Sequence, residues 1–248
     1  MRTVRLLLVG AAAGALAVGT AAPASAATSF VWNMDEPAGA RTMVGSPGPS
    51  GTIGTLVKTG VATDTGRGYS FPGGNPLPPQ PMPGKIVTVP ASAVPSPGTA
   101  AYSLSVRYRT GNTSNGNMVQ KGETGANGGM VKIELHAGVI NCTWFDKTWT
   151  RVNPPASSHL NLSQQAPKNL WTTVTCARMR ANTATGWKTT LTVTVGGQVT
   201  TTFQNRAVGA ITNTWPLAIG GKPQCSTQPV VECDYYSGLF DYVKLASG

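Results

Sequence analysis

Apolar and polar residues alternate with a period of two along most of the chain, and no stretch shows a convincing helical periodicity. In residues 102–109 the apolar side chains occupy one phase and the polar side chains the other. Successive side chains of a strand point to opposite faces, so this pattern predicts a strand with one buried face. The same alternation predicts strands at 131–136, 139–145, 171–178 and 187–195.

Shorter segments extend this pattern to both ends of the chain. Gly196-Gly197 follows one alternating segment and precedes another, which predicts a two-residue β-hairpin turn. With no linker and no internal repeat, the chain from residue 27 to 248 is expected to form one all-β domain, a sandwich or a barrel, of about twelve to fourteen strands. The additional strands are expected at 30–34, 53–57, 69–71, 85–89, 118–121, 198–203, 216–220 and 238–245.

The composition agrees with a β-rich, turn-rich protein. The 248 residues include 30 Gly and 19 Pro, and only 11% are charged, which argues against a helical bundle or a coiled coil. The chain has 19 Lys and Arg against 9 Asp and Glu. These basic residues are scattered singly rather than clustered on one segment, which argues against a nucleic-acid partner. No apolar run long enough to span a membrane occurs beyond the N-terminus, so no membrane partner is expected.

Residues 1–26 have the features of a secretory signal peptide. Arg2 and Arg5 form a short basic region, an apolar stretch follows, and Ala24-Ser25-Ala26 matches a small-residue cleavage site. We therefore expect a secreted, extracellular protein that begins near residue 27. Removal of the two arginines leaves 17 basic against nine acidic residues, a net charge of +8.

Four cysteines remain in the expected mature chain: Cys142, Cys176, Cys225 and Cys233. An even number in an exported protein predicts two disulfides, for which three pairings are possible. Pairing Cys225 with Cys233 would close a short loop and leave Cys142 with Cys176. A zinc site is disfavoured, because no C-x-x-C pair occurs and both histidines lie far from such a pair.

Seven segments carry familiar motifs: residues 31–36, 68–73, 102–106, 119–122, 171–176, 219–222 and 238–243. Their order resembles laminin G-like, concanavalin A-like jelly rolls of secreted actinobacterial proteins. Each segment is a weak signal, but together they cover nearly all of the chain after residue 26. The resemblance implies a two-sheet antiparallel jelly-roll sandwich in which the first and last strands are neighbours. It does not specify an activity, since this fold occurs in lectins, glycosidases and adhesion domains.

Candidate catalytic groups are few. Glycosidases need two carboxyl groups, and relatives that resemble laminarinases carry them on an E-x-D-x-x-E strand. No such strand occurs here, because the nearest match has Ser237 at its last position. Glu134 and His136 share the polar phase of one predicted strand and could perform acid–base chemistry, although a solvated or groove-lining polar face is the favoured explanation. The sequence therefore favours a protein that is not an enzyme.

Asp241 is unusual because it occurs in phase with the apolar residues Leu239, Val243 and Leu245. A buried carboxylate requires a cation or several hydrogen-bond donors. The resemblance implies a structural calcium ion between the first and last strands, which Asp241 and Asp35 could ligate with backbone carbonyls. A hydrogen-bonded Asp241 that ties its strand to a loop is the alternative.

Exposed aromatic residues are the remaining candidates, because the apolar faces of sugar rings pack on them. Trp32, Trp171 and Trp187 occupy apolar phases and are expected in the core, whereas polar residues surround Trp149. We therefore predict a non-catalytic, lectin-like domain that binds an extracellular polysaccharide or other glycan. Its groove is expected to contain Arg107, Glu134, His136 and Trp149.

Two alternatives remain to this prediction. One is a glycoside hydrolase or polysaccharide lyase that uses Glu134, His136 and a neighbouring basic residue. A lyase needs a base and a cation rather than paired carboxylates, so the missing E-x-D-x-x-E strand does not exclude it. The other is a structural or adhesion domain without a small ligand. The sequence carries no signal for the oligomeric state.

Overall fold

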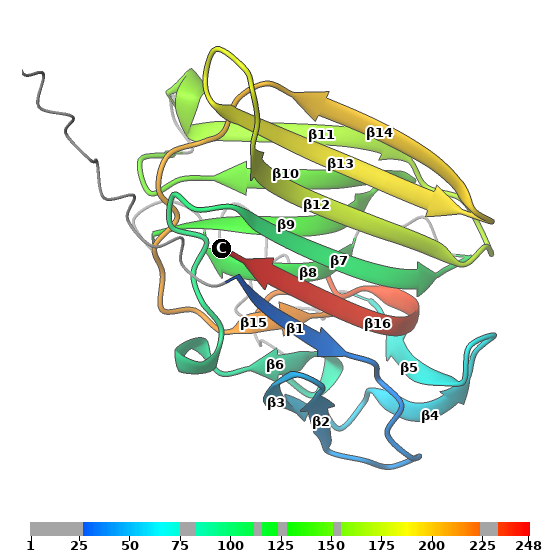
Figure 1. The fold of residues 1–248 in the computed structure, drawn as a ribbon. Helices are drawn as coiled ribbons and strands as arrows, with labels where there is room; N and C mark the ends of the chain where they lie inside the picture. Colours follow the sequence, from blue (N-terminus) through cyan, green and yellow to red (C-terminus); the bar gives the residue numbers. More distant parts are fainter. Residues whose placement is uncertain (1–26, 75–82, 112–115, 124–127, 151–154, 224–232) are drawn as a thin grey trace, which may run out of the picture.

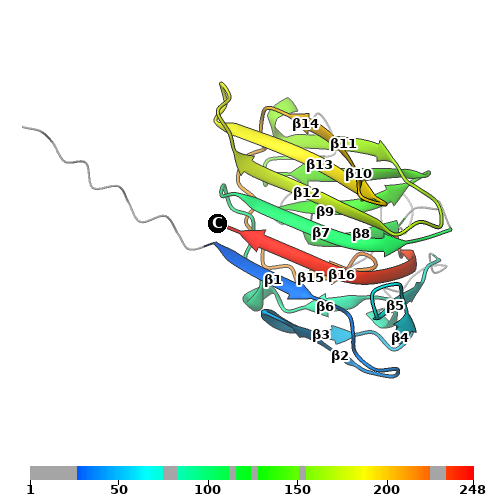
Figure 2. The same cartoon turned by 45° about the vertical axis from the view of Figure 1, so that its right-hand side comes forward.

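A computed structural model describes residues 27–74, 83–111, 116–123, 128–150, 155–223 and 233–248. In these parts of the chain, sixteen strands form two antiparallel sheets that face each other (Figures 1 and 2). Short 3₁₀ turns at Pro83–Lys85, Ala91–Ala93 and Ala156–Ser158 lie between strands. The predicted two-sheet jelly-roll sandwich is confirmed. The predicted signal peptide lies outside the described residues.

One sheet, here called the β7 sheet, has the order β14-β13-β12-β7-β16-β5-β4, with β1 also paired to β16. Its strands are β1 (Thr28–Trp32), β4 (Lys58–Ala62), β5 (Arg67–Pro72), β7 (Tyr102–Arg109), β12 (Thr172–Arg180), β13 (Trp187–Val195), β14 (Gln198–Gln204) and β16 (Ser237–Ser247).

The other sheet, here called the β9 sheet, has the order β11-β10-β9-β8-β15-β6-β3-β2. Its strands are β2 (Thr42–Gly45), β3 (Gly48–Ile53), β6 (Val87–Val89), β8 (Gly116–Glu123), β9 (Gly129–His136), β10 (Val139–Phe145), β11 (His159–Gln165) and β15 (Leu217–Ile219).

The core lies between the two sheets. Leu104 and Val106 of β7 are fully buried, as are Val131 and Ile133 of β9, while the alternate residues of each strand point away from the core. The Cys142–Cys176 disulfide connects β10 to β12 and so joins the two sheets. This pair was one of the predicted possibilities.

The second predicted disulfide lies only partly within the described residues. Cys233 is disulfide-bonded. Cys225 lies outside the described residues, so the pairing of Cys233 with Cys225 stays a prediction.

The last strand, β16, has different neighbours along its length. Its first part pairs with β5, its second part pairs with β1, and β7 runs along its other side. The pairing register with β7 shifts between Phe240 and Tyr242, which leaves Asp241 at a β-bulge. The predicted contact between the first and last strands is therefore confirmed, and the bulge explains why Asp241 breaks the apolar phase of its strand.

Strands were predicted accurately where apolar and polar residues alternate strictly, and less accurately where the alternation is weak. The expected segments 102–109, 139–145 and 187–195 coincide with β7, β10 and β13. β2, β4 and β11 were not expected, because the first two are short and β11 has only two apolar residues in seven. The segment 53–57 was expected as a strand, but most of it lies after the end of β3 at Ile53. Among the described residues, no helix is long and apolar enough to cross a membrane.

Candidate functional site

Three of the four residues predicted to line one groove lie on two opposite faces of the sandwich. Arg107 belongs to β7, whereas Glu134 and His136 belong to β9 in the other sheet. Their neighbours Val106 and Leu135 are buried in the core, so the three side chains point outward on opposite sides of it. The prediction of a shared groove is therefore wrong, because alternation along a strand does not reveal which sheet the strand joins.

Trp149 is also distant from His136. Its half-buried ring packs on Phe145 at the end of β10, with 4.5 Å between the ring centroids. Phe145 pairs with Met130 at the first part of β9, whereas His136 is the last residue of that strand. Six residues of strand separate the two positions by about 20 Å.

Glu134 has a charged partner on its own strand. The Lys132 ammonium group donates to the Glu134 carboxylate, and both side chains are more than four-fifths buried. His136 is exposed beside the turn that leads into β10. The structure thus confirms that Glu134 and His136 share one face, as their common phase predicted, and adds an ion pair with Lys132.

Of the four residues predicted to line the groove, Arg107 is the one whose side chain makes a network of ion pairs beside a pocket. Its guanidinium forms two parallel hydrogen bonds with Asp64, of 2.9 Å from Nη1 to Oδ1 and 2.7 Å from Nη2 to Oδ2. Nη1 also donates to Oδ2 of Asp241 at 2.8 Å. Asp64 lies in the loop between β4 and β5, so a single side chain ties that loop to β7 and to β16. Bidentate charge-assisted pairs of this kind hold their geometry well.

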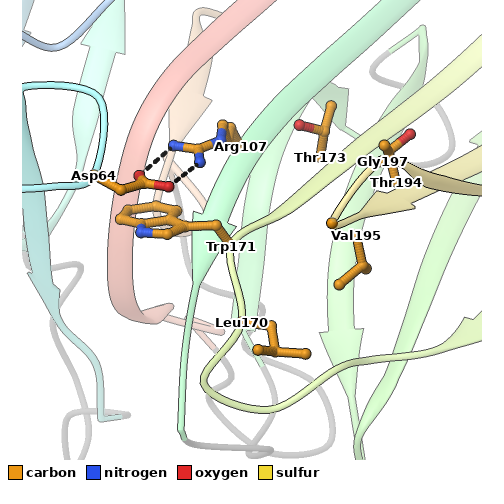
Figure 3. Close-up of a pocket in the computed structure, with 9 residues that line it drawn as sticks. Asp64, Arg107, Leu170, Trp171, Thr173, Thr194, Val195 and Gly197 are labelled. Atoms are coloured by element: carbon orange, nitrogen blue, oxygen red, sulfur yellow. Dashed lines mark hydrogen bonds and ion pairs between the residues drawn. The ribbon is translucent and has the colours of Figure 1, made fainter.

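Trp171 lies against this ion pair (Figure 3). The Arg107 guanidinium carbon is 4.6 Å from the centroid of the indole ring, and that of Arg109 is 5.2 Å away. The indole N–H is buried and has no hydrogen-bond partner among the described residues. Cation–π contacts of this length fix the ring in place.

The expectation that Trp171 lies in the core is wrong. Val174 and Cys176 of β12 face the core, so Trp171 has the same outward phase as Thr173. The sequence carried part of this signal, since Val174 and Cys176 occupy the even-numbered phase of the segment and Trp171 the odd-numbered one. Trp187 is likewise only half buried, and the centroid of its ring is 3.9 Å from the guanidinium carbon of Arg180.

A pocket of about 470 Å³ opens beside Trp171 and Arg107. Apolar side chains and hydroxyl groups both line it, and the Gly196-Gly197 turn between β13 and β14 completes its wall. A second pocket of about 400 Å³ adjoins the first, because Arg107 and Thr173 line both. We call the two together the Arg107 groove. The first pocket is lined by Asp64, Arg107, Leu170, Trp171, Thr173, Thr194, Val195, Gly196 and Gly197. The second shares Arg107 and Thr173 and adds Asn33, Asp35, Thr65, Asp241 and Tyr242.

The ion pair keeps both of its partners charged. Hydrogen bonding to Arg107 is the main cause that lowers the pKa of Asp64, and Asp64 in turn raises the pKa of Arg107. A general acid for glycoside cleavage needs the opposite change, a carboxyl group whose pKa is raised. Asp64 is therefore suited to accept hydrogen bonds rather than to donate a proton.

Asp241 is satisfied by protein donors. Oδ1 accepts hydrogen bonds from Thr65 Oγ1 at 2.6 Å and from Thr63 Oγ1 at 3.1 Å, and Oδ2 accepts from Arg107. Its side chain is 8% exposed. This is the predicted alternative in which a hydrogen-bonded Asp241 ties its strand to a loop.

Calcium fits this arrangement poorly. The ion prefers six to eight oxygen ligands. Asp35 and Asp241 line the same pocket, but a guanidinium already lies against Asp241. Among the described residues no group of three or more His, Cys, Asp or Glu could hold a metal ion. In this pocket the residues present do not fit a calcium ion, because the Arg107 guanidinium already occupies the Asp241 carboxylate.

The fold is similar to those of several solved structures. The binding domain of botulinum neurotoxin serotype G matches with a TM-score of 0.51 and 11% identity, over 88% of this chain and 46% of that chain. Another structure, the botulinum neurotoxin type G receptor binding domain, matches with a TM-score of 0.50 and 10% identity, over 89% and 47%. Domains LG4-5 of the mouse laminin alpha1 chain match with a TM-score of 0.44 and 14% identity, over 72% and 40%.

The two matches to the toxin domains agree with the two-sheet sandwich described above, and identities of this size establish nothing beyond the fold. The chain spans about half the length of the structures it matches. No protein-family model matches the sequence, and no curated protein is similar to it in sequence.

Proposed function

We propose that this protein is a secreted, non-catalytic domain that binds an extracellular glycan in the Arg107 groove. The observation that carries the proposal is the combination of an apolar wall and fixed polar groups in one open pocket. Trp171, Leu170 and Val195 supply the apolar surface, while Asp64 and Thr194 supply acceptors and hydroxyls. A sugar ring has one apolar C–H face and a rim of hydroxyl groups, so it needs both kinds of surface.

The ion pair makes the polar part of the groove rigid before any ligand arrives. Arg107 holds Asp64 through both carboxylate oxygens, yet half of the Asp64 side chain remains exposed. A carboxylate has about four acceptor sites, so Asp64 can still accept hydrogen bonds from two neighbouring hydroxyls of a sugar. Groups that are held in place lose little entropy when a ligand binds, which favours recognition.

The groove offers little for cleavage of a glycosidic bond. Asp64 and Asp241 both accept from Nη1 of Arg107, and the pKa of Asp64 is lowered. Hydrolysis requires one protonated carboxyl group and one ionised carboxylate on opposite sides of the bond. A binding role does not need one protonated and one ionised carboxyl group, so it agrees with two carboxylates that both accept hydrogen bonds from Arg107.

Two further features support the extracellular part of the proposal. The N-terminal segment reads as a signal peptide. The disulfide between Cys142 and Cys176 forms and persists in oxidising compartments such as the extracellular space. One of the similar structures is the botulinum neurotoxin type G receptor binding domain, which supports a binding role for this fold.

The test combines a binding assay with an assay for cleavage products. Purified protein is mixed with insoluble and soluble polysaccharides, and depletion from solution and new reducing or unsaturated ends are measured in the same samples. We expect depletion without product, and about tenfold weaker binding for Trp171→Ala because a central aromatic contact is lost.

The matched control is Trp149→Ala, which removes a tryptophan near the β9 sheet, on the other side of the sandwich. Arg107→Lys keeps the charge but loses the planar fork, and should weaken binding as well. Binding that survives Trp171→Ala but fails in Trp149→Ala would move the site to the other sheet. New chain ends would contradict the non-catalytic role.

A further inference from the structure

β14 is an edge strand that lacks the usual protection against pairing with another chain. It lies at the end of the β7 sheet, with β13 on one side and no paired strand among the described residues on the other (Figures 1 and 2). Its seven residues, Gln198–Gln204, include no charge and no proline. Val199 and Phe203 are 63% and 51% exposed. Edge strands normally carry a lysine, a proline or a bulge that prevents such pairing.

The opposite end of the same sheet has this protection. β4 carries the exposed Lys58, and its register with β5 shifts between Lys58 and Val61. Of these two edge strands, β4 is therefore protected against pairing with another chain, whereas β14 is available for it.

The turn before β14 determines which of its backbone groups are free. Val195 and Gln198 are paired across the Gly196-Gly197 turn, in which both glycines have positive φ. In a two-residue hairpin this closing pair is hydrogen-bonded, and hydrogen-bonded pairs then alternate along the ladder. The N–H and C=O groups of Val199, Thr201 and Phe203 therefore point away from β13. No backbone hydrogen bond from these groups to another described segment occurs outside the ladder.

The sequence of β14 is nearly symmetric about Thr201. It reads Gln-Val-Thr-Thr-Thr-Phe-Gln, so an antiparallel copy centred on Thr201 would pair Val199 with Phe203 and Gln198 with Gln204. Val199, Thr201 and Phe203 lie on the outer face, opposite Thr194, Thr192 and Thr190 of β13. Pairs of an aromatic and a β-branched residue stabilise neighbouring strands.

We propose that β14 pairs antiparallel with β14 of a second copy of this chain, which makes the protein a two-fold symmetric dimer with a continuous β7 sheet. The free groups of Val199, Thr201 and Phe203 would form six hydrogen bonds across the two-fold axis. Neither β14 nor β11, the edge strand of the other sheet at this end, carries a Lys, Arg, Asp or Glu. Lys188 of β13 lies over the Phe203 ring, 4.1 Å from its centroid, and antiparallel pairing about Thr201 would place the two copies of Lys188 at opposite ends of the paired strands. A self-complementary patch of this kind is what a two-fold interface requires.

The geometry has one consequence for binding. The axis of such a dimer is perpendicular to the sheet, so both Arg107 grooves open on the same side. The Gly196-Gly197 turn lines the groove and leads directly into β14, which brings each groove near the interface. A dimer would then hold a polymer at two points and increase its apparent affinity. This consequence rests on the proposed function, whereas the dimer itself does not.

The oligomeric state tests the proposal directly. Light scattering and sedimentation of the purified protein, from micromolar to millimolar concentration, should show twice the mass of the chain. Thr201→Lys places two ammonium groups opposite each other on the axis and should halve that mass. Thr192→Lys is the matched control, because it makes the same change on the same face one strand further in, and it should remain dimeric. A wild-type protein of single mass throughout, or a dimeric Thr201→Lys variant, would overturn the proposal.

Cross-linking provides a second test that does not destabilise the interface. Directly paired residues of a hydrogen-bonded antiparallel pair have Cα atoms about 5.5 Å apart, within the reach of a disulfide. Thr201→Cys should therefore give a reducible covalent dimer under mild oxidation, and Thr192→Cys should not. Equal cross-linking of the two variants would contradict the pairing.

Discussion

Lys121 is a buried lysine whose charge should reduce the stability of the fold at neutral pH. It lies on β8 opposite Val131 and Leu217, two buried residues, so its side chain faces the core. Its ammonium group donates to the carbonyl oxygen of Trp215, and no ion pair with Lys121 occurs among the described residues. Burial lowers the pKa of Lys121 from 10.5 to about 8.

This lowered pKa makes the stability depend on pH in a definite direction. Between pH 8 and pH 10.5 the unfolded chain binds more protons at this residue than the folded chain, so the free energy of unfolding rises with pH. From pH 7 to pH 9.5 the expected rise due to Lys121 is about 2 kcal/mol. Buried tyrosines with raised pKa act in the opposite direction only above about pH 10, so the window ends before them.

The perturbation is Lys121→Met, which keeps a long unbranched side chain and removes the charge. The variant also loses the hydrogen bond to Trp215, and this loss changes its free energy of unfolding by an amount that does not depend on pH. The difference in unfolding free energy between wild type and variant is therefore followed from pH 7 to pH 9.5 by urea unfolding and tryptophan fluorescence. Wild type should gain about 2 kcal/mol relative to Lys121→Met over this window.

The control is Lys58→Met, which removes a lysine from the exposed strand β4. Its stability should change with pH in parallel with that of wild type. Parallel curves for wild type and Lys121→Met would refute the reasoning, because they would mean that Lys121 has the same proton affinity in the folded and unfolded chains.

Three other predictions follow from the described contacts. Replacing both Cys142 and Cys176 by Ala should lower the free energy of unfolding by about 4 kcal/mol, because the bond closes a loop of 34 residues in the unfolded chain; a loss below about 1 kcal/mol in urea unfolding would contradict this. Because the pKa of Asp64 is lowered, glycan retention should be constant from pH 8 to pH 5 and should fall only below the ordinary carboxyl pKa of 3.8; a midpoint near pH 6 would point to a different group. Since Arg107, Thr63 and Thr65 already satisfy Asp241, a metal chelator should leave the melting temperature unchanged, and a clear decrease would restore the calcium hypothesis.

The local pattern of the sequence determined much of the fold. Strict alternation in Tyr102–Arg109 and Trp187–Val195 set both the strands and the sides on which their residues lie, because the side-chain period of a strand is two. The outward position of Arg107 follows from that phase, and so does that of Trp171 once Val174 and Cys176 are taken to define the inner phase. The Gly196-Gly197 turn, and the symmetric strand after it, can also be read without a structure.

The tertiary structure alone decided which side chains form a site. Asp64 and Trp171 reach Arg107 from loops 43 and 64 residues away in sequence, and no periodicity encodes that approach. Glu134 and His136 have the same outward phase as Arg107, yet they lie across the core from it because β9 joins the other sheet. A strand pattern specifies faces, whereas long-range pairing specifies which faces belong together. The alternation therefore determined the sandwich, and the order of strands in the two sheets determined the Arg107 groove.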